Sequence, residues 1–278
     1  GRLGHSSFGT ELLTAADSDD ADRIANELDK FNQERRTIES YVLDAAEKQV
    51  TEEKLNKKLL IVFGEDWHEG VIGIIASRLK DKYHRPCIVI TVSKGKAKGS
   101  GRSIKGIDLG NLVISAKQAG LINSGGGHSM AAGLSLNENK IKELGNFFES
   151  KLSKTEFALS DEKIIYVDSQ ISSSGINLDI YDEIEKLGPF GSDNIEPTFV
   201  VKNSMVVSIN QVGENHLKCV IKTPEGAFFE AMAFRSSNTV LGDALQKNKG
   251  KMVSLLGKIK INEWGGRRVP QLHIEDIG

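Results

Sequence analysis

The chain has 278 residues, of which 39% are hydrophobic and 27% charged, and its formal net charge is −2. This composition suits a globular protein of about two domains. No apolar run approaches the roughly 20 residues that cross a bilayer, and no apolar leader opens the chain, so we expect a soluble, cytoplasmic protein and exclude a membrane-spanning one.

Charge is segregated along the chain, although the total is close to zero. Acidic residues dominate residues 9–66 and 158–199, whereas residues 94–105 hold five Lys or Arg and no acid. Residues 246–268 hold seven Lys or Arg against the single acid Glu263. One basic cluster could be a solvated surface, but two clusters that both adjoin glycine favour contact with a polyanion.

The first predicted element is one long amphipathic helix over residues 17–50. It begins at an acidic stretch in which Asp17 or Ser18 can act as N-cap. Its apolar residues recur every three or four positions in a stripe one seam wide, and no Gly or Pro interrupts it. We therefore expect a connecting strut between domains. The chain opens on Gly1 rather than Met, which indicates a piece of a longer protein or an expression scar.

Residues 57–153 alternate strands with helices, which predicts an α/β layer. Strands are predicted at KKLLIVFGE and RPCIVITVS, a strand or turn at KAKGSGRSI, and a further strand that starts in a glycine-rich stretch. Helices are predicted at GVIGIIASRLKDKY and DLGNLVISAKQAG, followed by a closing helix that Asn137 caps.

Residues 163–278 give several short β-rich runs separated by turn signals, with short helices near 177–187 and 239–247. Five or six short strands with an internal helix favour a small Greek-key barrel of the OB type. The only cysteines, Cys87 and Cys219, lie far apart in apolar strand-like runs, so we expect two core thiols and a reducing compartment.

Two short motifs of the α/β segment offer donors to an anion. In WHEGVIG, His68 stands just before a helix whose free N–H groups and positive dipole end attract anions. In GSGRS, Ser100, Arg102 and Ser103 offer hydroxyl and guanidinium donors between glycines. Arg102 can bind a phosphate through two parallel hydrogen bonds.

A third motif, GGGH, could bind the same anion. Gly125, Gly126 and Gly127 could form a nest of successive N–H groups, with His128 at its rim. Each of the three motifs alone is more often a turn or an ordinary surface residue. Together they predict a phosphate site.

Basic side chains also gather near the end of the chain. Alternation puts Lys258 and Lys260 on one face of a strand, where they could steer a nucleic-acid backbone or simply protect a strand edge. Trp264 lies at a hairpin tip and could stack on a base, and Arg267 and Arg268 follow it.

These motifs resemble a known family. GGGHSMAAG, with SGRS and WHEGVIGIIASRL upstream, resembles the DHHA1 domain of the DHH phosphoesterase superfamily. The opening GRLGHSS with its long helix, and the turn LGPFGSDNIEPTF, resemble the RecJ family of bacterial 5′-to-3′ single-strand-specific exonucleases. The resemblance implies three parts: the end of a DHH domain with a long linker helix (1–56), an α/β DHHA1 domain with a mixed sheet (57–155), and an all-β OB-type barrel (156–278).

The resemblance also implies roles for residues. Ser100 and Arg102 match the family's pocket for the 5′-terminal phosphate, Arg2 matches a linker arginine that joins them, and His128 with its glycines matches the phosphate-binding motif. The family's metal-binding Asp-His-His motif, which implies Mn²⁺ or Mg²⁺, belongs to a DHH domain, and this chain contains no Asp-His-His and no His pair at metal-ligand spacing. We expect no catalytic residue and no metal site here, and a chain that binds without cutting.

The implied partner is single-stranded DNA, with a helicase and a single-strand binding protein as further candidates, and the implied role is DNA repair and recombination without a membrane. Two alternatives stay open at this point. One is an oligoribonuclease or dinucleotide phosphodiesterase of the same superfamily. The other is a non-catalytic module that binds single strands or recognises tRNA.

Overall fold

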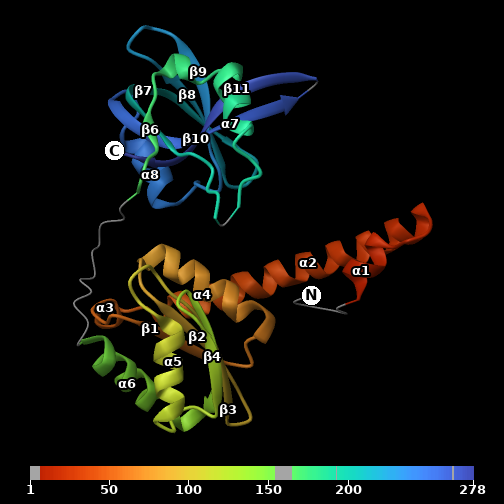
Figure 1. Cartoon of the computed structure of the whole chain (residues 1–278), viewed down its shortest axis with the longest axis vertical. Coiled ribbons are helices and arrows are strands. Elements are labelled where there is room, and N and C mark those ends of the chain that lie inside the picture. The colour runs from red at the N-terminus through yellow and green to blue at the C-terminus, as the bar shows by residue number, and fades with distance from the viewer. Residues whose placement is uncertain (1–6, 154–164, 192, 265) are drawn as a thin grey trace. The chain divides into compact units, whose positions relative to one another are not determined.

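The structure of the protein is a computed structural model that describes residues 7–153, 165–191, 193–264 and 266–278 (Figure 1). The chain forms two compact units, residues 1–163 and 164–278. No helix within these described ranges is both long and apolar enough to cross a bilayer.

Cys87 and Cys219 are both buried free thiols, which confirms the prediction of two core thiols. Burial raises the pKa of the Cys87 thiol to about 12 and that of Cys219 to about 11.

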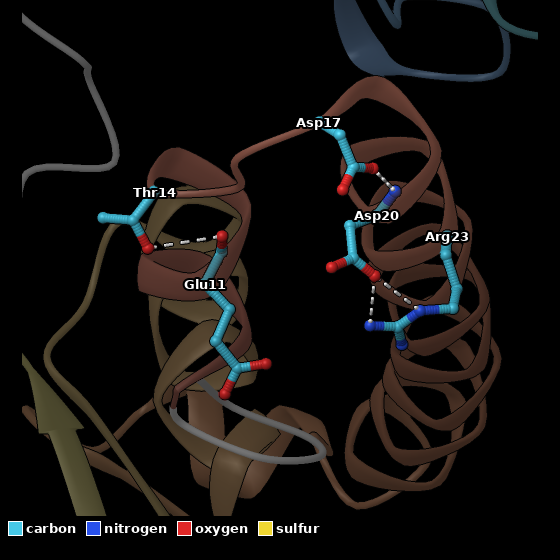
Figure 2. Close-up of polar contacts among 5 residues, drawn as sticks. All are labelled: Glu11, Thr14, Asp17, Asp20 and Arg23. Atoms are coloured by element: carbon cyan, nitrogen blue, oxygen red, sulfur yellow. Dashed lines mark hydrogen bonds and ion pairs between the residues drawn. The ribbon is translucent and has the colours of Figure 1, made fainter.

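The first unit begins with helices α1 (Phe8–Leu13) and α2 (Ser18–Glu47). Asp17 is the N-cap of α2, because its carboxylate accepts a hydrogen bond from the N–H of Asp20 at 2.8 Å, and Asp20 in turn pairs with Arg23 (Figure 2). Of the two predicted caps, Asp17 is therefore the one used. Helix α1 is absent from the sequence prediction, since six residues are too few to show a helical period.

Different parts of α2 have different surroundings. Near the middle of α2, α1 packs back on it through the rings of Phe8 and Phe31, whose centroids lie 6.1 Å apart. Near its end, Val42 and Ala46 are fully buried in a core shared with α4 (Glu69–Tyr83). The first part of α2 extends away from the sheet in Figure 1, and its role as a connecting strut stays a prediction. Its last turns belong to the α/β core.

The sheet of the first unit has five strands in the order β1-β2-β3-β5-β4. Strands β1 and β2 run parallel and the other neighbours antiparallel, which makes the sheet mixed, as predicted. The bounds are β1 (Leu60–Glu65), β2 (Cys87–Ser93), β3 (Lys96–Arg102), β4 (Ser124–His128) and β5 (Ala131–Asn137). Segment 96–102, a strand or turn in the prediction, is a full strand at the centre of the sheet.

Helices cover both faces of this sheet. Helix α4 and the end of α2 pack on one face, and α5 and α6 pack on the other. The remaining bounds are α3 (Glu52–Leu55), α5 (Leu109–Gln118), η1 (Glu138–Lys140) and α6 (Ile141–Ser153). The predicted cap of the closing helix is wrong, because the Asn137 side chain makes no capping bond and η1 intervenes before α6.

The second unit is a closed five-stranded barrel. Its strands follow the order β7-β8-β9-β11-β10, β10 pairs back with β7, and β9 pairs with β11 in parallel. This arrangement confirms the predicted OB-type barrel. The bounds are β6 (Ser169–Gln170), η2 (Ser173–Gly175), α7 (Leu178–Glu185), β7 (Phe199–Val212), β8 (His216–Lys222), β9 (Phe228–Ala233), α8 (Val240–Lys247), β10 (Met252–Trp264) and β11 (Arg267–Ile277). The first predicted strand shrinks to the two residues of β6.

Candidate functional site

The register of three strands brings two of the predicted motifs to one face of the sheet. Strand β5 lies between β3 and β4, and its Ala131 pairs with Arg102 on one side and His128 on the other. Gly133 likewise pairs with Ser100 and Gly126. Neighbouring strands are about 4.8 Å apart, so β3 and β4 lie about 10 Å apart.

Because side chains two residues apart share a face, these residues form one surface. We name it the small-residue face, and its members are Ser100, Arg102, Gly126, His128, Ala131 and Gly133.

Arg102 is the cation of this face. It is half-buried, and its Nη1 donates to the carbonyl of Gly101 at 2.8 Å and to Oγ of Ser100 at 3.4 Å. Among the described residues, none of the ion pairs neutralises Arg102. A guanidinium without a carboxylate partner keeps its donors for an anionic ligand.

Helix α4 approaches the small-residue face at Gly73. A Cβ at this position would lie 3.0 Å from Oγ of Ser100 and 3.3 Å from Nη2 of Arg102. The glycine therefore leaves room for both side chains between helix and sheet. The sequence analysis missed this residue, because a glycine inside a helical pattern carries no sign of what lies opposite it.

The three consecutive glycines do not form the predicted nest. They are extended and pair with β5 in an antiparallel ladder at the edge of the sheet, so their N–H groups do not converge on one point. Gly125 packs under Val113, and at Gly126 no atom lies within 4 Å of an added Cβ. Gly127 has φ +157° and a Cβ there would lie 2.2 Å from the carbonyl oxygen of Ala131.

A tight turn follows β4 and fixes His128. His128 is exposed, and its Nδ1 accepts the N–H of Met130 at 3.3 Å. The same turn is tied to the rest of the unit, because the N–H of Ser103 donates to the carbonyl of Met130 and the N–H of Leu109 donates to that of Ser129.

Ser103 does not offer its hydroxyl to an anion. The side chain is 1% exposed, and its Oγ donates to the carbonyl of Ile107 at 2.7 Å. Its contacts make it a support for the turn that carries His128, which corrects the sequence prediction.

His68 is the N-cap of α4. Its Nδ1 accepts the N–H of Gly70 at 3.0 Å, and the ring is exposed. The next residue, Glu69, pairs with Lys98 of β3 at 2.8 Å, so the first turn of α4 lies along the strand that carries Ser100. His68 therefore caps the helix with one ring nitrogen, and the helix start lies beside the small-residue face.

Most of the basic residues that were predicted to contact DNA from the barrel form ion pairs with acidic residues of the same unit. Lys258 pairs with Glu275 at 3.2 Å and Lys260 with Glu196 at 2.7 Å. Arg268 pairs with Asp182 at 3.0 Å.

Of the remaining predicted residues, Arg267 is described, Trp264 is described only in part and Arg2 is not described. Arg267 is exposed and has no ion pair among the described residues. The side chain of Trp264 and the whole of Arg2 lie outside the described residues.

The structure shows an aromatic cluster that the sequence analysis missed. The ring of Phe234, which follows β9, lies 5.1 Å from that of His216 and 4.7 Å from that of His273. These residues are far apart in sequence, and only the barrel register could have revealed their proximity.

No group of three or more His, Cys, Asp or Glu side chains that could hold a metal ion occurs in the described parts of the chain.

Comparisons with known proteins match both units. Residues 56–154 match the family described as the DHHA1 domain, and residues 167–276 match the RecJ OB domain. The chain is 32% identical to the single-stranded-DNA-specific exonuclease RecJ of Bacillus subtilis, over 99% of this chain and 35% of that protein. It is also 32% identical to the RecJ of Escherichia coli, over 100% of this chain and 48% of that protein.

Solved structures show the same fold. The crystal structure of RecJ from Thermus thermophilus in complex with Mn²⁺ aligns with a TM-score of 0.78 at 23% identity, covering 100% of this chain and 39% of that one. The Mg²⁺ complex of the same protein aligns with a TM-score of 0.76 over 99% of this chain and 41% of that one. The chain therefore spans less than half the length of these relatives.

Proposed function

This chain belongs to the RecJ family, and we propose that it is the part of a single-stranded-DNA-specific 5′-to-3′ exonuclease that binds the strand and its 5′-terminal phosphate. One observation carries the proposal. Arg102 and His128 flank the same residue, Ala131, on a face that Gly126 and Gly133 keep free of large side chains. A phosphoryl group can approach such a backbone closely while the guanidinium binds its oxygens.

The contribution of this face is to position the substrate. Holding the terminal phosphate fixes the distance between the end of the strand and the bond to be cut, which lowers the entropy cost of the reaction without breaking a bond. Ser100 adds a hydroxyl next to the guanidinium. His68 and the first turn of α4 add a positive dipole end beside β3.

We place the hydrolytic chemistry outside the residues described here. The resemblance to the family supports this proposal, because the family's Asp-His-His motif belongs to a DHH domain and this chain contains no Asp-His-His. The relatives from Thermus thermophilus were crystallised with Mg²⁺ and with Mn²⁺, which supports a divalent ion in a DHH domain of the whole enzyme. Such ions activate water and stabilise the leaving oxygen.

The barrel is proposed to bind the strand without reading its sequence. Lys258, Lys260, Arg267 and Arg268 supply positive charge. The ion pairs of Lys258 and Arg268 with exposed acids are weak enough to exchange for phosphates. Lys260 is the least available of them, because its partner Glu196 is only 12% exposed. For the whole enzyme we propose a role in DNA repair and recombination, with a helicase and a single-strand binding protein as partners.

The test is the binding of 5′-phosphorylated and 5′-hydroxyl oligodeoxynucleotides, measured by fluorescence anisotropy. Arg102→Ala is expected to lose about 2 kcal/mol on the phosphorylated strand only, because charge-assisted hydrogen bonds are worth about 1.5–3 kcal/mol. Arg102→Lys should recover part of that loss, since a point charge replaces a bidentate contact.

Two variants serve as references. Arg36→Ala removes an exposed arginine from α2 and should change neither affinity. Lys258→Ala should weaken both ligands equally and lower the salt dependence of binding. Equal losses on both ligands for Arg102→Ala would contradict end recognition by this face.

A further inference from the structure

An aromatic cluster lies on the outer surface of the barrel. The packing of the barrel does not require these side chains to be exposed. Phe234 is 48% exposed and lies beyond the end of β9, outside the group of residues that form the barrel core. The neighbouring Ala233 points into that core and is completely buried. The exposure of Phe234 and its absence from the core group place its ring on the outside of the barrel.

Two imidazoles hold the ring of Phe234. His216 lies edge-on at 5.1 Å and 65°, and its Nδ1 accepts the N–H of Arg235 at 2.9 Å, which fixes the orientation of the ring. His273 lies at 4.7 Å and 60°, and its Nε2 is 3.0 Å from Nε2 of Gln271. Burial, and then the charge of Lys260, lower the pKa of His273, which favours the neutral ring. The cluster is therefore preorganised rather than flexible.

Basic side chains lie near these rings, together with the acids Glu196 and Glu275, which pair with Lys260 and Lys258. Arg235 is exposed and follows Phe234 directly, and no ion pair engages it among the described residues. Lys258 lies opposite His273 across β10 and β11, and Lys218 lies opposite Met232 on β8. Lys218 pairs with Glu230 at 2.7 Å, but both side chains are about 40% exposed, so the pair is weak.

We propose that His216, Phe234 and His273 form a base-stacking site for single-stranded DNA, with Arg235 contacting the adjacent phosphate. This inference rests on the proposed function, and it adds a contact with the bases of the strand. An exposed, fixed aromatic ring among cations is the arrangement that binds a single strand without sequence preference. Its location agrees, because β8 and β9 are the second and third strands of the barrel, the strands whose face binds oligonucleotides in OB folds.

The test uses the full chain and a 5′-hydroxyl oligothymidylate, so that end recognition does not contribute. Phe234→Ala is expected to weaken binding about 5- to 150-fold, which is the range for one lost base stack. Phe234→Trp should keep the affinity, and its fluorescence should be quenched when a base stacks on it. Arg235→Ala should lower the slope of log K against log salt by about 0.7, whereas Phe234→Ala should leave the slope unchanged.

The matched control is Phe228→Ala, which removes a ring that is 61% exposed at the start of β9 but has no imidazole neighbour among the described residues. It should change the affinity less than twofold. An equal loss at both positions, or full affinity in Phe234→Ala with unchanged circular dichroism, overturns the stacking site. The preference for a 5′-phosphate should persist in Phe234→Ala, so its absence from the unmodified protein would contradict the proposed function and not this inference.

Discussion

At the scale of single residues, Gly126 and Gly127 are neighbours with opposite surroundings. Gly126 faces open space, whereas Gly127 has a positive φ and lies against the backbone of Ala131. We expect Gly127→Ala to cost about 3 kcal/mol or more, because it adds backbone strain to a steric clash. Gly126→Ala should change stability by less than about 1 kcal/mol but weaken binding of a 5′-phosphorylated strand, because its methyl group covers the small-residue face.

Thermal unfolding and anisotropy on the same two variants check this pair. Loss of stability in Gly126→Ala, or normal stability in Gly127→Ala, would contradict the antiparallel pairing of β4 with β5. The comparison separates the glycine needed for the fold from the glycine needed for the surface.

The positions of single residues were only partly predictable from the sequence. Arg102 and His128 could be chosen as candidates because each stands in a short motif with a recognisable chemistry, and their binding roles stay predictions. The buried hydroxyl of Ser103 could not be distinguished from that of Ser100, since both flank the same arginine and only the strand register separates them. Gly73 could not be found at all, because its importance lies in what faces it across the helix–sheet interface.

At the scale of elements, one buried carboxylate joins two helices. Glu39 of α2 is 2% exposed and forms ion pairs with Arg35 of its own helix and Arg78 of α4. We expect Glu39→Gln to destabilise the first unit by about 3 kcal/mol, because it leaves two arginines without their shared carboxylate. Urea unfolding measures the loss. Arg23→Ala, which removes an exposed pair on α2, should cost less than about 1 kcal/mol.

If Glu39→Gln were as stable as the unmodified chain, the buried ion pairs of Glu39 would not be needed to hold α2 on the α/β unit. Apolar packing around Val42 and Ala46, together with the ion pair between Glu47 and Lys82, would then account for the attachment.

The elements were predictable where the hydrophobic period was long enough. Helix α2, the buried strands β1 and β2 and most strands of the barrel follow directly from their apolar patterns. Strand β3 was ambiguous, because KAKGSGR carries charge on one face and glycine on the other, and glycine gives no hydrophobic signal. Helix α3 has four residues, too short for any period to appear.

At the scale of the whole molecule, each of the two units carries one of the proposed contacts for single-stranded DNA. When a single ligand engages both, the second contact forms at the effective concentration set by the first, so affinity rises with strand length. We expect the affinity for 5′-phosphorylated oligodeoxynucleotides to rise from dinucleotide to long strand, and to rise less in Phe234→Ala.

Titration of a length series measures this effect. Equal affinity for dinucleotides and long strands would favour a dinucleotide phosphodiesterase instead. Arg102→Ala provides the reference, since it should lower affinity at every length while leaving the increase with length intact.

Strand β5 pairs with β3 over residues 131–137 and with β4 over residues 131–135, which limits the changes of chain length that it can accept. Inserting or deleting one residue within 131–137 would shift the register of β5 by one position. Buried side chains such as those of Ala132 and Leu134 would then turn outward, and the shifted residues would pair with different residues of β3 and β4. The turn at Lys94 and Gly95 connects the ends of β2 and β3. An insertion there shifts no register within the sheet, so this turn can be lengthened. Among related sequences, gaps should therefore be tolerated at 94–95 and excluded from 131–137.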